Sequence, residues 1–314
     1  MTFSLHEKKI WVAGHRGMVG SAVVRALSRE NCEILTVDRK SLDLTRQDQV
    51  HDWLAVHKPH AVVLAAAKVG GIMANNQYPA DFLYDNLMIE TNIIHSSYKT
   101  GVEKLLFLGS SCIYPRNCPQ PIKEEYLLTD KLEPTNEWYA IAKIAGIKLC
   151  QAYSKQHGCN FISAMPTNLY GIGDTYSFEN SHVIPALIMK IDKALKEQEN
   201  EVEIWGTGIP RREFLYADDL AEALVFLLKN YSDPAPINIG CGEDVSIADL
   251  AMIVAQTIGF NGNFRFNTEK PDGTPRKLLD VTRLKELGWV AKTSLEAGLK
   301  YAYQDYISRY GINK

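Results

Sequence analysis

A tyrosine and a lysine near the middle of the chain are spaced for acid–base chemistry. Tyr139 and Lys143 are four residues apart in a stretch of helical character, so their side chains share one face. A free phenol, with a pKa of about 10, is a poor acid or base at neutral pH, but a neighbouring ammonium stabilises the phenolate. Upstream, Ser110 follows an apolar strand candidate, where a hydroxyl can donate to a carbonyl oxygen that gains charge. The three residue types together indicate hydride transfer to a carbonyl, and a chance Tyr-x-x-x-Lys match is the alternative.

A glycine-rich loop close to the N-terminus predicts a dinucleotide site. Gly14, Gly17 and Gly20 lie between the strand candidate Lys9–Ala13 and the start of a helix candidate. In such a loop the first glycine allows a tight turn, the second lets a pyrophosphate approach the backbone, and the third allows close helix–strand packing. A glycine-rich turn with only a structural role is the alternative.

The end of the second strand candidate bears on the choice of cofactor. An acid at this point usually binds the ribose hydroxyls of NAD, whereas an arginine accommodates the extra phosphate of NADP. Here Asp38 and Arg39 are adjacent, and Arg16 lies in the glycine loop. Two arginines can form charge-assisted bonds with a 2′-phosphate, so the sequence favours NADP. An ordinary surface role for Arg39 is the alternative.

The elements that must position these residues follow a βαβ order, which is typical of a Rossmann-type, doubly wound parallel α/β sheet. The expected strands are Lys9–Ala13, Ile34–Val37, Ala61–Ala66, Leu105–Leu108 and Phe161–Pro166. The expected helices are Met18–Glu30, Asp48–His57, Tyr78–Thr100 and Glu137–His157. We expect a dinucleotide-binding domain over residues 1–175, with a return of about 214–242 that holds Tyr216–Lys229 and Ile237–Ile239. A smaller α/β substrate-binding domain is expected over residues 176–314.

Composition and charge exclude several classes of protein. Of the 314 residues 46% are hydrophobic and 23% charged, and the net charge is −3, so a disordered chain or a strongly basic nucleic-acid binder is excluded. The apolar run Ala61–Ala67 is far shorter than a bilayer span, and the first ten residues lack a signal core. The six cysteines form no C-x-x-C pair. We therefore expect a soluble, cytoplasmic protein without a metal site and without membrane or nucleic-acid partners.

Longer strings carry a resemblance to a known family. They are GHRGMVGSA, AAAKVGGI, FLGSSCIYP, EPTNEWYAIAKIAGIKLC, MPTNLYG, NSHVIPAL and KPDGTPRKLLDVTRL. Over essentially its whole length the chain resembles the extended short-chain dehydrogenase/reductases, and within them the NADPH enzymes that convert GDP-4-keto-6-deoxy-D-mannose to GDP-L-fucose. The resemblance implies epimerisation at C3 and C5 and then reduction of the C4 ketone, all in one site.

Epimerisation requires an acid and a base besides the tyrosine, because the C4 ketone acidifies the hydrogens on C3 and C5. By resemblance, Cys112 and His182 are this pair, and their reference pKa values of about 8.5 and 6.5 bracket neutral pH. Without the resemblance, Cys112 would more often be a buried structural thiol and His182 a packing or capping residue. The resemblance thus gives the catalytic set Ser110, Cys112, Tyr139, Lys143 and His182.

Dehydration is a disfavoured function. Dehydratases of the same superfamily carry Thr-Asp-Glu where this chain has Ser111-Cys112-Ile113, and the missing carboxylates disfavour dehydration.

Two other functions remain open as alternatives. Another NDP-sugar epimerase/reductase that performs part of the sequence is one alternative. A non-catalytic, dinucleotide-sensing protein is the other.

The resemblance also implies which residues bind the two small molecules. Those for NADP(H) are Gly14, His15, Arg16, Gly17, Met18, Val19, Gly20, Arg39, Asp43, Leu44, Leu108, Gly109, Ser110, Lys143, Pro166, Asn168, Leu169 and His182. Those for the GDP-sugar are Lys190, Trp205, Arg212, Asp272 and Lys277, whereas Arg211 and Arg276 are expected to be structural or solvated. Family members pair through the helices expected at Tyr78–Thr100 and Glu137–His157, so we expect a homodimer. A role for their apolar residues in the monomer core is the alternative.

Overall fold

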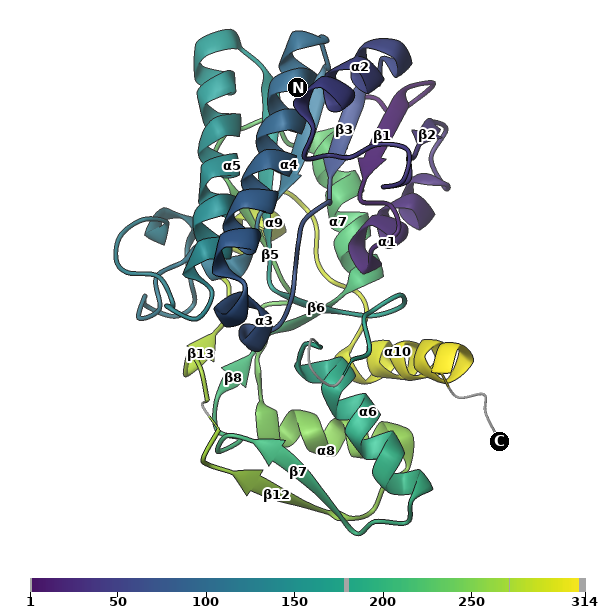
Figure 1. Ribbon diagram of the computed structural model, residues 1–314, viewed down its shortest axis with the longest axis vertical. Coiled ribbons are helices and arrows are strands. Elements are labelled where there is room, and N and C mark those ends of the chain that lie inside the picture. The colour runs from purple at the N-terminus through teal and green to yellow at the C-terminus, as the bar shows by residue number, and fades with distance from the viewer. Residues whose placement is uncertain (1, 178–180, 271, 311–314) are drawn as a thin grey trace.

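A six-stranded, wholly parallel sheet forms the centre of the larger lobe in this computed structural model, which describes residues 2–177, 181–270 and 272–310 (Figure 1). The strand order is β10 (Ile237–Ile239), β5 (Asn160–Pro166), β4 (Lys104–Leu108), β3 (Ala61–Leu64), β1 (Lys9–Ala13) and β2 (Glu33–Leu35). The chain first builds outward from β1 to β2 and then crosses back to β3. The order therefore reverses between β1 and β3, where doubly wound sheets bind their ligands. The predicted fold class is confirmed.

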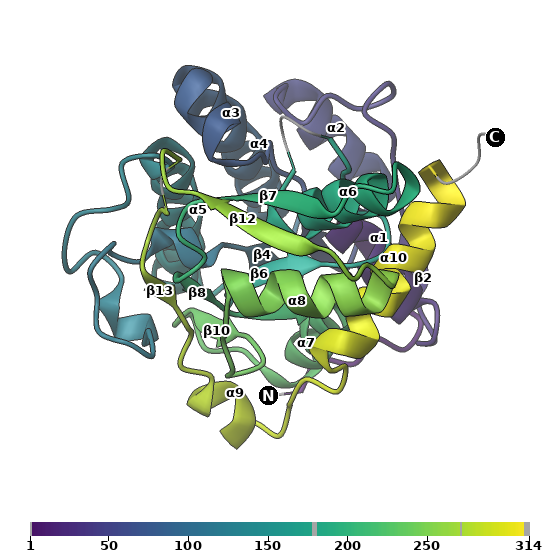
Figure 2. The ribbon, with the colours of Figure 1, turned by 90° about the horizontal axis from the view of Figure 1, so that it is seen from below.

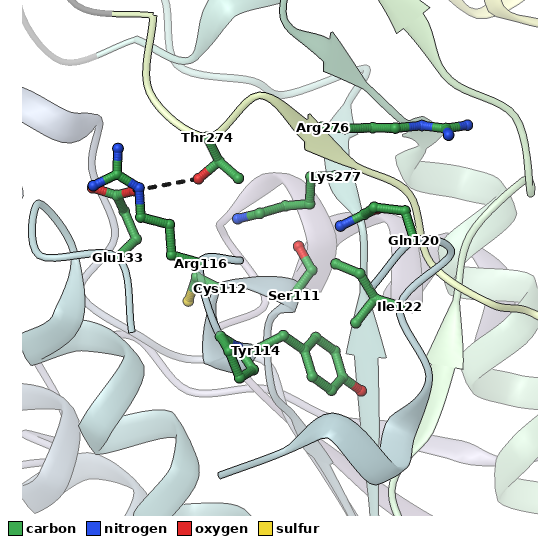
Figure 3. Close-up of a pocket in the computed structure, with 11 residues that line it drawn as sticks. Ser111, Cys112, Tyr114, Arg116, Gln120, Ile122, Glu133, Thr274, Arg276 and Lys277 are labelled. Carbon is green, nitrogen blue, oxygen red and sulfur yellow. Dashed lines mark hydrogen bonds and ion pairs between the residues drawn. The ribbon is translucent and has the colours of Figure 1, made fainter. Parts of the chain in front are cut away.

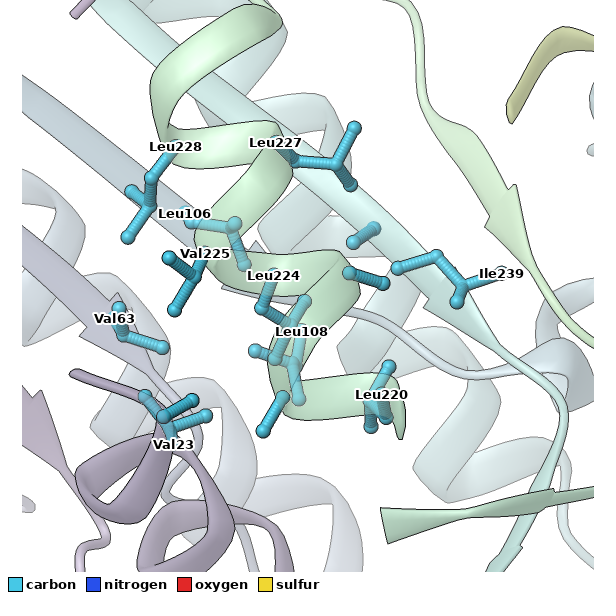
Figure 4. Packing of buried hydrophobic residues seen from close by; sticks show 14 of the residues in the cluster. Val23, Val63, Leu106, Leu108, Leu220, Leu224, Val225, Leu227, Leu228 and Ile239 are labelled. Carbon is cyan, nitrogen blue, oxygen red and sulfur yellow. The ribbon is translucent and has the colours of Figure 1, made fainter. Parts of the chain in front are cut away.

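Helices cover both faces of this sheet, which is why its strands are apolar throughout. On one face α1 (Met18–Leu27) and α7 (Ala217–Asn230) pack on strand residues such as Val63 and Leu106 (Figure 4). On the other face lie α2 (Gln47–His57), α4 (Pro79–Lys99) and α5 (Glu137–His157). Because side chains alternate along a strand, Val12 enters the first core and Trp11 the second.

The smaller lobe lies beyond the carboxyl ends of the large sheet's strands (Figures 1 and 2). Its helices α6 (Val183–Lys196), α8 (Ile247–Ile258) and α10 (Leu295–Tyr310) share a third apolar core. Its strands are short and form pairs or triplets: β6 (Asn168–Tyr170) with β9 (Phe214–Tyr216), β7 (Glu201–Trp205) with β12 (Asn263–Asn267), and β8 (Arg211–Arg212) between β11 (Val245–Ser246) and β13 (Arg276–Lys277). The remaining helices are α3 (Ile72–Gln77), α9 (Thr282–Glu286) and the single turns η1 (Ser111–Ile113) and η2 (Glu124–Tyr126).

Some predicted element ends differ from those observed, and the glycine loop explains one of them. The strand expected at Ala61–Ala66 ends at Leu64, because Ala65 and Ala66 pass under the loop, where a Cβ on Gly14 would lie 2.6 Å from the Ala66 nitrogen. The expected helix Met18–Glu30 ends at Leu27, and the strand expected at Ile34–Val37 spans Glu33–Leu35. In the described residues, no helix has both the length and the apolar character to cross a membrane.

Candidate active site

The glycine loop forms a tight turn at the start of α1. Gly14 has a φ of +91°, and the Gly17 N–H donates to the Gly14 carbonyl at 3.1 Å. A Cβ on Gly20 would collide with that carbonyl, whereas a Cβ on Gly17 would meet only the Gly14 oxygen, at 3.6 Å. No side chain caps α1, so the N–H groups of its first turn are available to an anion at the positive end of the helix dipole. The loop geometry fits the phosphates of a dinucleotide.

Charged side chains gather where β2 ends, beside this loop. The Asp38 carboxylate pairs with Arg16 at 2.7 Å and lies 3.4 Å from the His15 ring nitrogen, while Arg39 is exposed. Farther along, hydrogen bonds from Thr45 lower the pKa of Asp43. The Leu44 carbonyl accepts from the Asn92 side chain on α4 at 3.0 Å. Because the Asp38 carboxylate is already paired with Arg16, its repulsion of a nearby 2′-phosphate is reduced.

Ser110 and Cys112 follow β4 at the carboxyl edge of the sheet. The Ser110 hydroxyl accepts from the Cys112 N–H at 3.4 Å and so caps the turn η1. The Cys112 side chain is buried, and burial raises the pKa of its thiol, with the ammonium of Lys277 as the largest opposing influence. Lys277 extends over Ser111 and Cys112, whereas Arg276 points the opposite way (Figure 3). The structure thus places a residue predicted to bind substrate beside a residue predicted to be catalytic.

Tyr139 and Lys143 meet as their spacing predicts. The Lys143 Nζ lies 5.8 Å from the centre of the Tyr139 ring and 4.6 Å from that of Phe107. Burial lowers the pKa of Lys143 and raises that of Tyr139 well above 10, and Cys112 and Glu90 raise the pKa of Tyr139 further. Desolvation of the phenolate is the largest of these influences on Tyr139. Tyr139 therefore holds its proton at neutral pH.

His182 lies immediately before α6, and its carbonyl accepts from the Ala186 N–H at 3.1 Å. Its side chain is exposed, and desolvation by the nearby protein atoms lowers the pKa of its imidazole from the usual value. In the part of the chain that the structure describes, no hydrogen bond or ion pair joins His182 to Cys112, Tyr139 or Lys143. The pairing of His182 with Cys112 stays a prediction.

The other residues predicted for the cofactor lie around the same sheet edge. Leu108 ends β4, and a Cβ on Gly109 would collide with the Met165 side chain. Pro166 ends β5, and the side-chain amide of Asn168, on β6, donates to the Glu213 carbonyl at 2.8 Å. Met18, Val19 and Leu169 pack partly against the first apolar core.

The residues predicted to bind the GDP-sugar lie in the smaller lobe, in two groups. In one, the Lys190 Nζ lies 5.1 Å from the centre of the half-exposed Trp205 ring and donates to the Glu203 carbonyl at 3.1 Å. Nearby, the Asp272 carboxylate accepts from the N–H and the hydroxyl of Thr207, at 2.7 and 2.9 Å. A second cation, the Lys270 ammonium, lies 5.2 Å from the centre of the Trp205 ring.

The second group consists of Arg212 and Lys277, which are register partners on β8 and β13. Burial lowers the pKa of both side chains, and each cation also feels the carboxylate of Glu133. By contrast, Arg211 and Arg276 both pair with Asp244, at 2.8 and 2.5 Å. Unlike Arg211 and Arg276, Arg212 and Lys277 have no carboxylate partner in an ion pair of the described residues and can offset an anionic ligand.

Three glutamates of the site were missed by sequence reasoning. Glu133 forms an ion pair with Arg116 at 3.2 Å and accepts from the Thr274 hydroxyl at 3.4 Å (Figure 3). Glu213 is fully buried between the lobes, and Glu90 is buried on α4. Only Glu90 left a signal in the sequence: it falls on the same helical face as Ile93 and Ile94, and a carboxylate in an apolar stripe requires a cation.

Comparison with known proteins matches both lobes. The profile of the NAD dependent epimerase/dehydratase family matches residues 10–240. A GDP-L-fucose synthase of Sinorhizobium fredii is 59% identical over 99% of this chain and 99% of that protein. One of Escherichia coli is 50% identical over 96% of this chain and 98% of its own. A solved structure of a GDP-L-fucose synthetase from Naegleria fowleri bound to NADP has a TM-score of 0.90 at 29% identity, covering 99% of this chain and 97% of the other.

Proposed function

We propose, from the premise that this chain belongs to the NAD dependent epimerase/dehydratase family, that it is a GDP-L-fucose synthase. It is an NADP(H)-dependent enzyme. The observation that carries the assignment is a cluster at the sheet edge, in which the buried Cys112 thiol is close enough to the partly buried Tyr139 phenol to raise its pKa. A thiol for moving carbon-bound protons and a phenol for protonating an oxygen thus share one site.

For the substrate we propose GDP-4-keto-6-deoxy-D-mannose, and the two shifted side chains suit its epimerisation. At neutral pH the raised pKa keeps the Cys112 thiol protonated, and the lowered pKa keeps the His182 imidazole neutral. The pair therefore holds one proton to donate and one free base, as inversion at C3 or C5 requires when a proton leaves one face and another arrives on the opposite face.

For the reduction we propose that Tyr139 gives its proton to the C4 oxygen. The Ser110 hydroxyl donates a hydrogen bond to the same oxygen, and the Lys143 ammonium stabilises the phenolate that is left. When bound, NADPH supplies the hydride to C4. Its phosphates would lie on the glycine loop, where Gly17 leaves the backbone open, and its 2′-phosphate would be bound by Arg16 and Arg39.

Replacing Arg39 by alanine should then weaken the binding of NADPH more than that of NADH.

For the GDP moiety we propose binding by the five residues of the smaller lobe. Arg212 and Lys277 would offset the diphosphate, because a partly desolvated cation pairs strongly with a phosphate. Lys190, Trp205 and Asp272 would bind the rest of the nucleotide-sugar.

The test is turnover of GDP-4-keto-6-deoxy-D-mannose by the purified protein, followed by the absorbance of the reduced nicotinamide and by NMR of the product. We expect GDP-L-fucose, with one NADPH oxidised per product and slower oxidation of NADH. An epimerised ketone without NADPH oxidation would favour an enzyme that performs only part of the sequence. Tight NADPH binding without any turnover would favour a dinucleotide-sensing protein.

We further propose a homodimer that forms through α4 and α5. Both helices carry large exposed apolar side chains, with Tyr84 62% exposed on α4 and Trp138 and Ile141 39% and 41% exposed on α5. Sedimentation velocity of the protein and of a Tyr84→Lys/Ile141→Lys variant tests this, since the variant should sediment as a monomer. The cytoplasm is the proposed location, because all six cysteines are free thiols, as is common in a reducing compartment.

A further inference from the structure

Glu90 is a buried carboxylate next to the site that no step described above uses. It lies near the middle of α4 and is 1% exposed. Its neighbours on the buried face of α4 include Asn86, Ile93 and Ile94. An ionised carboxylate in such surroundings is costly unless a cation compensates for it.

That cation is Lys143. The Lys143 Nζ lies 3.8 Å from the Glu90 Oε2, and their side chains are 2% and 1% exposed. The other close neighbours of the ammonium are the aromatic rings of Phe107 and Tyr139. Within the described residues Glu90 is the one carboxylate that pairs with Lys143, and the Gly146 N–H and the Lys143 ammonium both oppose the rise of its pKa.

Helix α5 is shaped to admit this carboxylate. Gly146 lies three residues after Lys143, on the same face of α5. A Cβ at Gly146 would lie 3.0 Å from the Glu90 Cδ and 2.5 Å from the edge of the Phe107 ring. Glycine therefore leaves room for both neighbours of Lys143: the ring below the ammonium and the carboxylate beside it.

The charges around the pair act in known directions. Burial lowers the pKa of Lys143, and Glu90 opposes that change more strongly than Cys112 does. Burial also raises the pKa of Glu90, and Lys143 opposes it. The other titratable groups that face the pair are Tyr139 and Cys150 on α5, whose pKa values Glu90 raises. A buried ion pair contributes little to stability compared with well-packed apolar residues of similar volume, which points to a role in the chemistry.

We propose that Glu90 is a positioning residue for the C4 reduction, holding the Lys143 ammonium in place and charged beside Tyr139. The inference rests on the proposed function. Hydride adds to C4, the proton of the Tyr139 phenol passes to the C4 oxygen, and the electron pair of the broken O–H bond stays on the phenolate. The ammonium stabilises that phenolate and Glu90 compensates the ammonium, so no proton has to move to Glu90.

The first test is Glu90→Gln, which removes the charge and keeps the shape. Without the carboxylate the pKa of Lys143 falls, so the ammonium is lost at a lower pH. We expect kcat of NADPH oxidation to fall about tenfold at neutral pH, and the alkaline limb of its pH profile to move about one unit lower. Deuterium uptake at C3 and C5 from D₂O without NADPH should stay within about twofold of the wild type, because it depends on Cys112 and His182.

Two further variants separate charge from packing. Glu90→Asp keeps the charge, so the alkaline limb of the pH profile should return most of the way to its wild-type position. Ser97→Ala removes another buried polar group of α4 and should leave both the acid and the alkaline limb of that profile unchanged. Equal losses in the Gln and Asp variants with an unmoved alkaline limb would overturn the proposal, as would wild-type kinetics in Glu90→Gln.

A measurement on the cofactor-free protein keeps the proposal independent of turnover. Glu90→Gln should lower the unfolding midpoint, because it leaves the Lys143 ammonium unpaired, and Glu90→Gln/Lys143→Met should recover much of that loss. If the wild type fails to reduce the ketosugar, the proposed function fails. The double-mutant cycle of Glu90→Gln and Lys143→Met would still measure the coupling between the two side chains. Strictly additive midpoints would contradict the coupling itself.

Discussion

At the scale of the residue, desolvation shifts the pKa values of the buried Cys112 and of His182, whose side chain is partly open to solvent, in opposite directions. Desolvation disfavours whichever form is charged, so it keeps a thiol protonated and an imidazole neutral. The two groups then hold complementary protonation states over the same pH range, although their reference pKa values lie close together. The fold thus widens the pH range in which an acid and a base are available together.

The pH profile of epimerisation should show this widening. The lowered pKa keeps His182 neutral to a more acidic pH, so the acid limb should lie below pH 6.5. The raised pKa keeps the Cys112 thiol protonated to a more alkaline pH, so the alkaline limb should lie above the pKa of an ordinary cysteine thiol. Deuterium uptake at C3 and C5 without NADPH measures both limbs. An acid limb above pH 6.5 would mean that the imidazole is stabilised in its charged form instead.

The division of labour between Tyr139 and Cys112 predicts opposite effects of two small substitutions. Tyr139→Phe removes the proton donor for the C4 oxygen, so NADPH oxidation should fall by about 10²–10⁴-fold while deuterium uptake continues. Cys112→Ser replaces a thiol by a far weaker acid and should slow deuterium uptake first. Each variant is the control for the other. Full turnover by Cys112→Ser would remove Cys112 from its proposed role.

Sequence reasoning reached the residues whose types and spacing carry chemistry by themselves. Tyr139 and Lys143 came from a helical repeat, and Ser110 from the end of a strand. Glu90 was not found in this way, because its importance depends on the packing of α4 against α5. Glu90 precedes Lys143 by about 50 residues in the sequence, so no local pattern connects the two. Pairing between distant elements is a property of the tertiary structure, and the local pattern showed only an unexplained carboxylate.

At the scale of the element, the helices with clear end signals were predicted best. Helix α5 spans Glu137–His157 as expected, because Gly158 adopts the left-handed conformation that ends a helix. Helix α1 was predicted three residues too long, because Ser28, Arg29 and Glu30 form turns without a glycine. The strands β8, β11 and β13 have two residues each, which is too short for any periodicity, and their pairing was not predictable.

Two glycines of one loop should separate cofactor binding from stability. A Cβ at Gly20 collides with the Gly14 carbonyl, so Gly20→Ala should destabilise the free protein by about 1–3 kcal/mol. A Cβ at Gly17 meets only ordinary contacts, and its φ of −72° suits alanine. Gly17→Ala should therefore keep its unfolding midpoint while NADPH affinity falls at least about tenfold, as the methyl group occupies the pyrophosphate's approach.

Urea unfolding and NADPH fluorescence titration of both variants measure the contrast. The interpretation of the loop as a phosphate site fails if Gly17→Ala binds NADPH as tightly as the wild type.

At the scale of the whole molecule, the buried residue Glu213 is bonded to segments of both lobes. Its carboxylate accepts from the N–H groups of Gly242 and Leu279, at 2.7 and 3.0 Å. Its own N–H donates to the Lys277 carbonyl at 3.2 Å, and its carbonyl accepts from Asn168 at 2.8 Å. A residue proposed for the substrate, Lys277, and one proposed for the cofactor, Asn168, are thus both bonded to the backbone of Glu213. The division of the chain into two domains near residue 175 stays a prediction.

Removing the Glu213 side chain should weaken both lobes together. Glu213→Ala leaves the N–H groups of Gly242 and Leu279 without acceptors, each at about 1–3 kcal/mol, so the free energy of unfolding should fall by about 2–5 kcal/mol. Burial raises the pKa of Glu213, so the native state favours its protonated form, and wild-type stability should decline as the pH rises through that pKa. The alanine variant should lack this part of the pH dependence.

Urea unfolding at several pH values, with the exposed Glu269→Ala as control, measures both effects. If the lobes were independent, Glu213→Ala would split the transition into two, with one half unchanged. Because β10 and α7 bury their apolar side chains in the large sheet while Glu213 directly precedes β9, we expect one cooperative transition at a lower urea concentration.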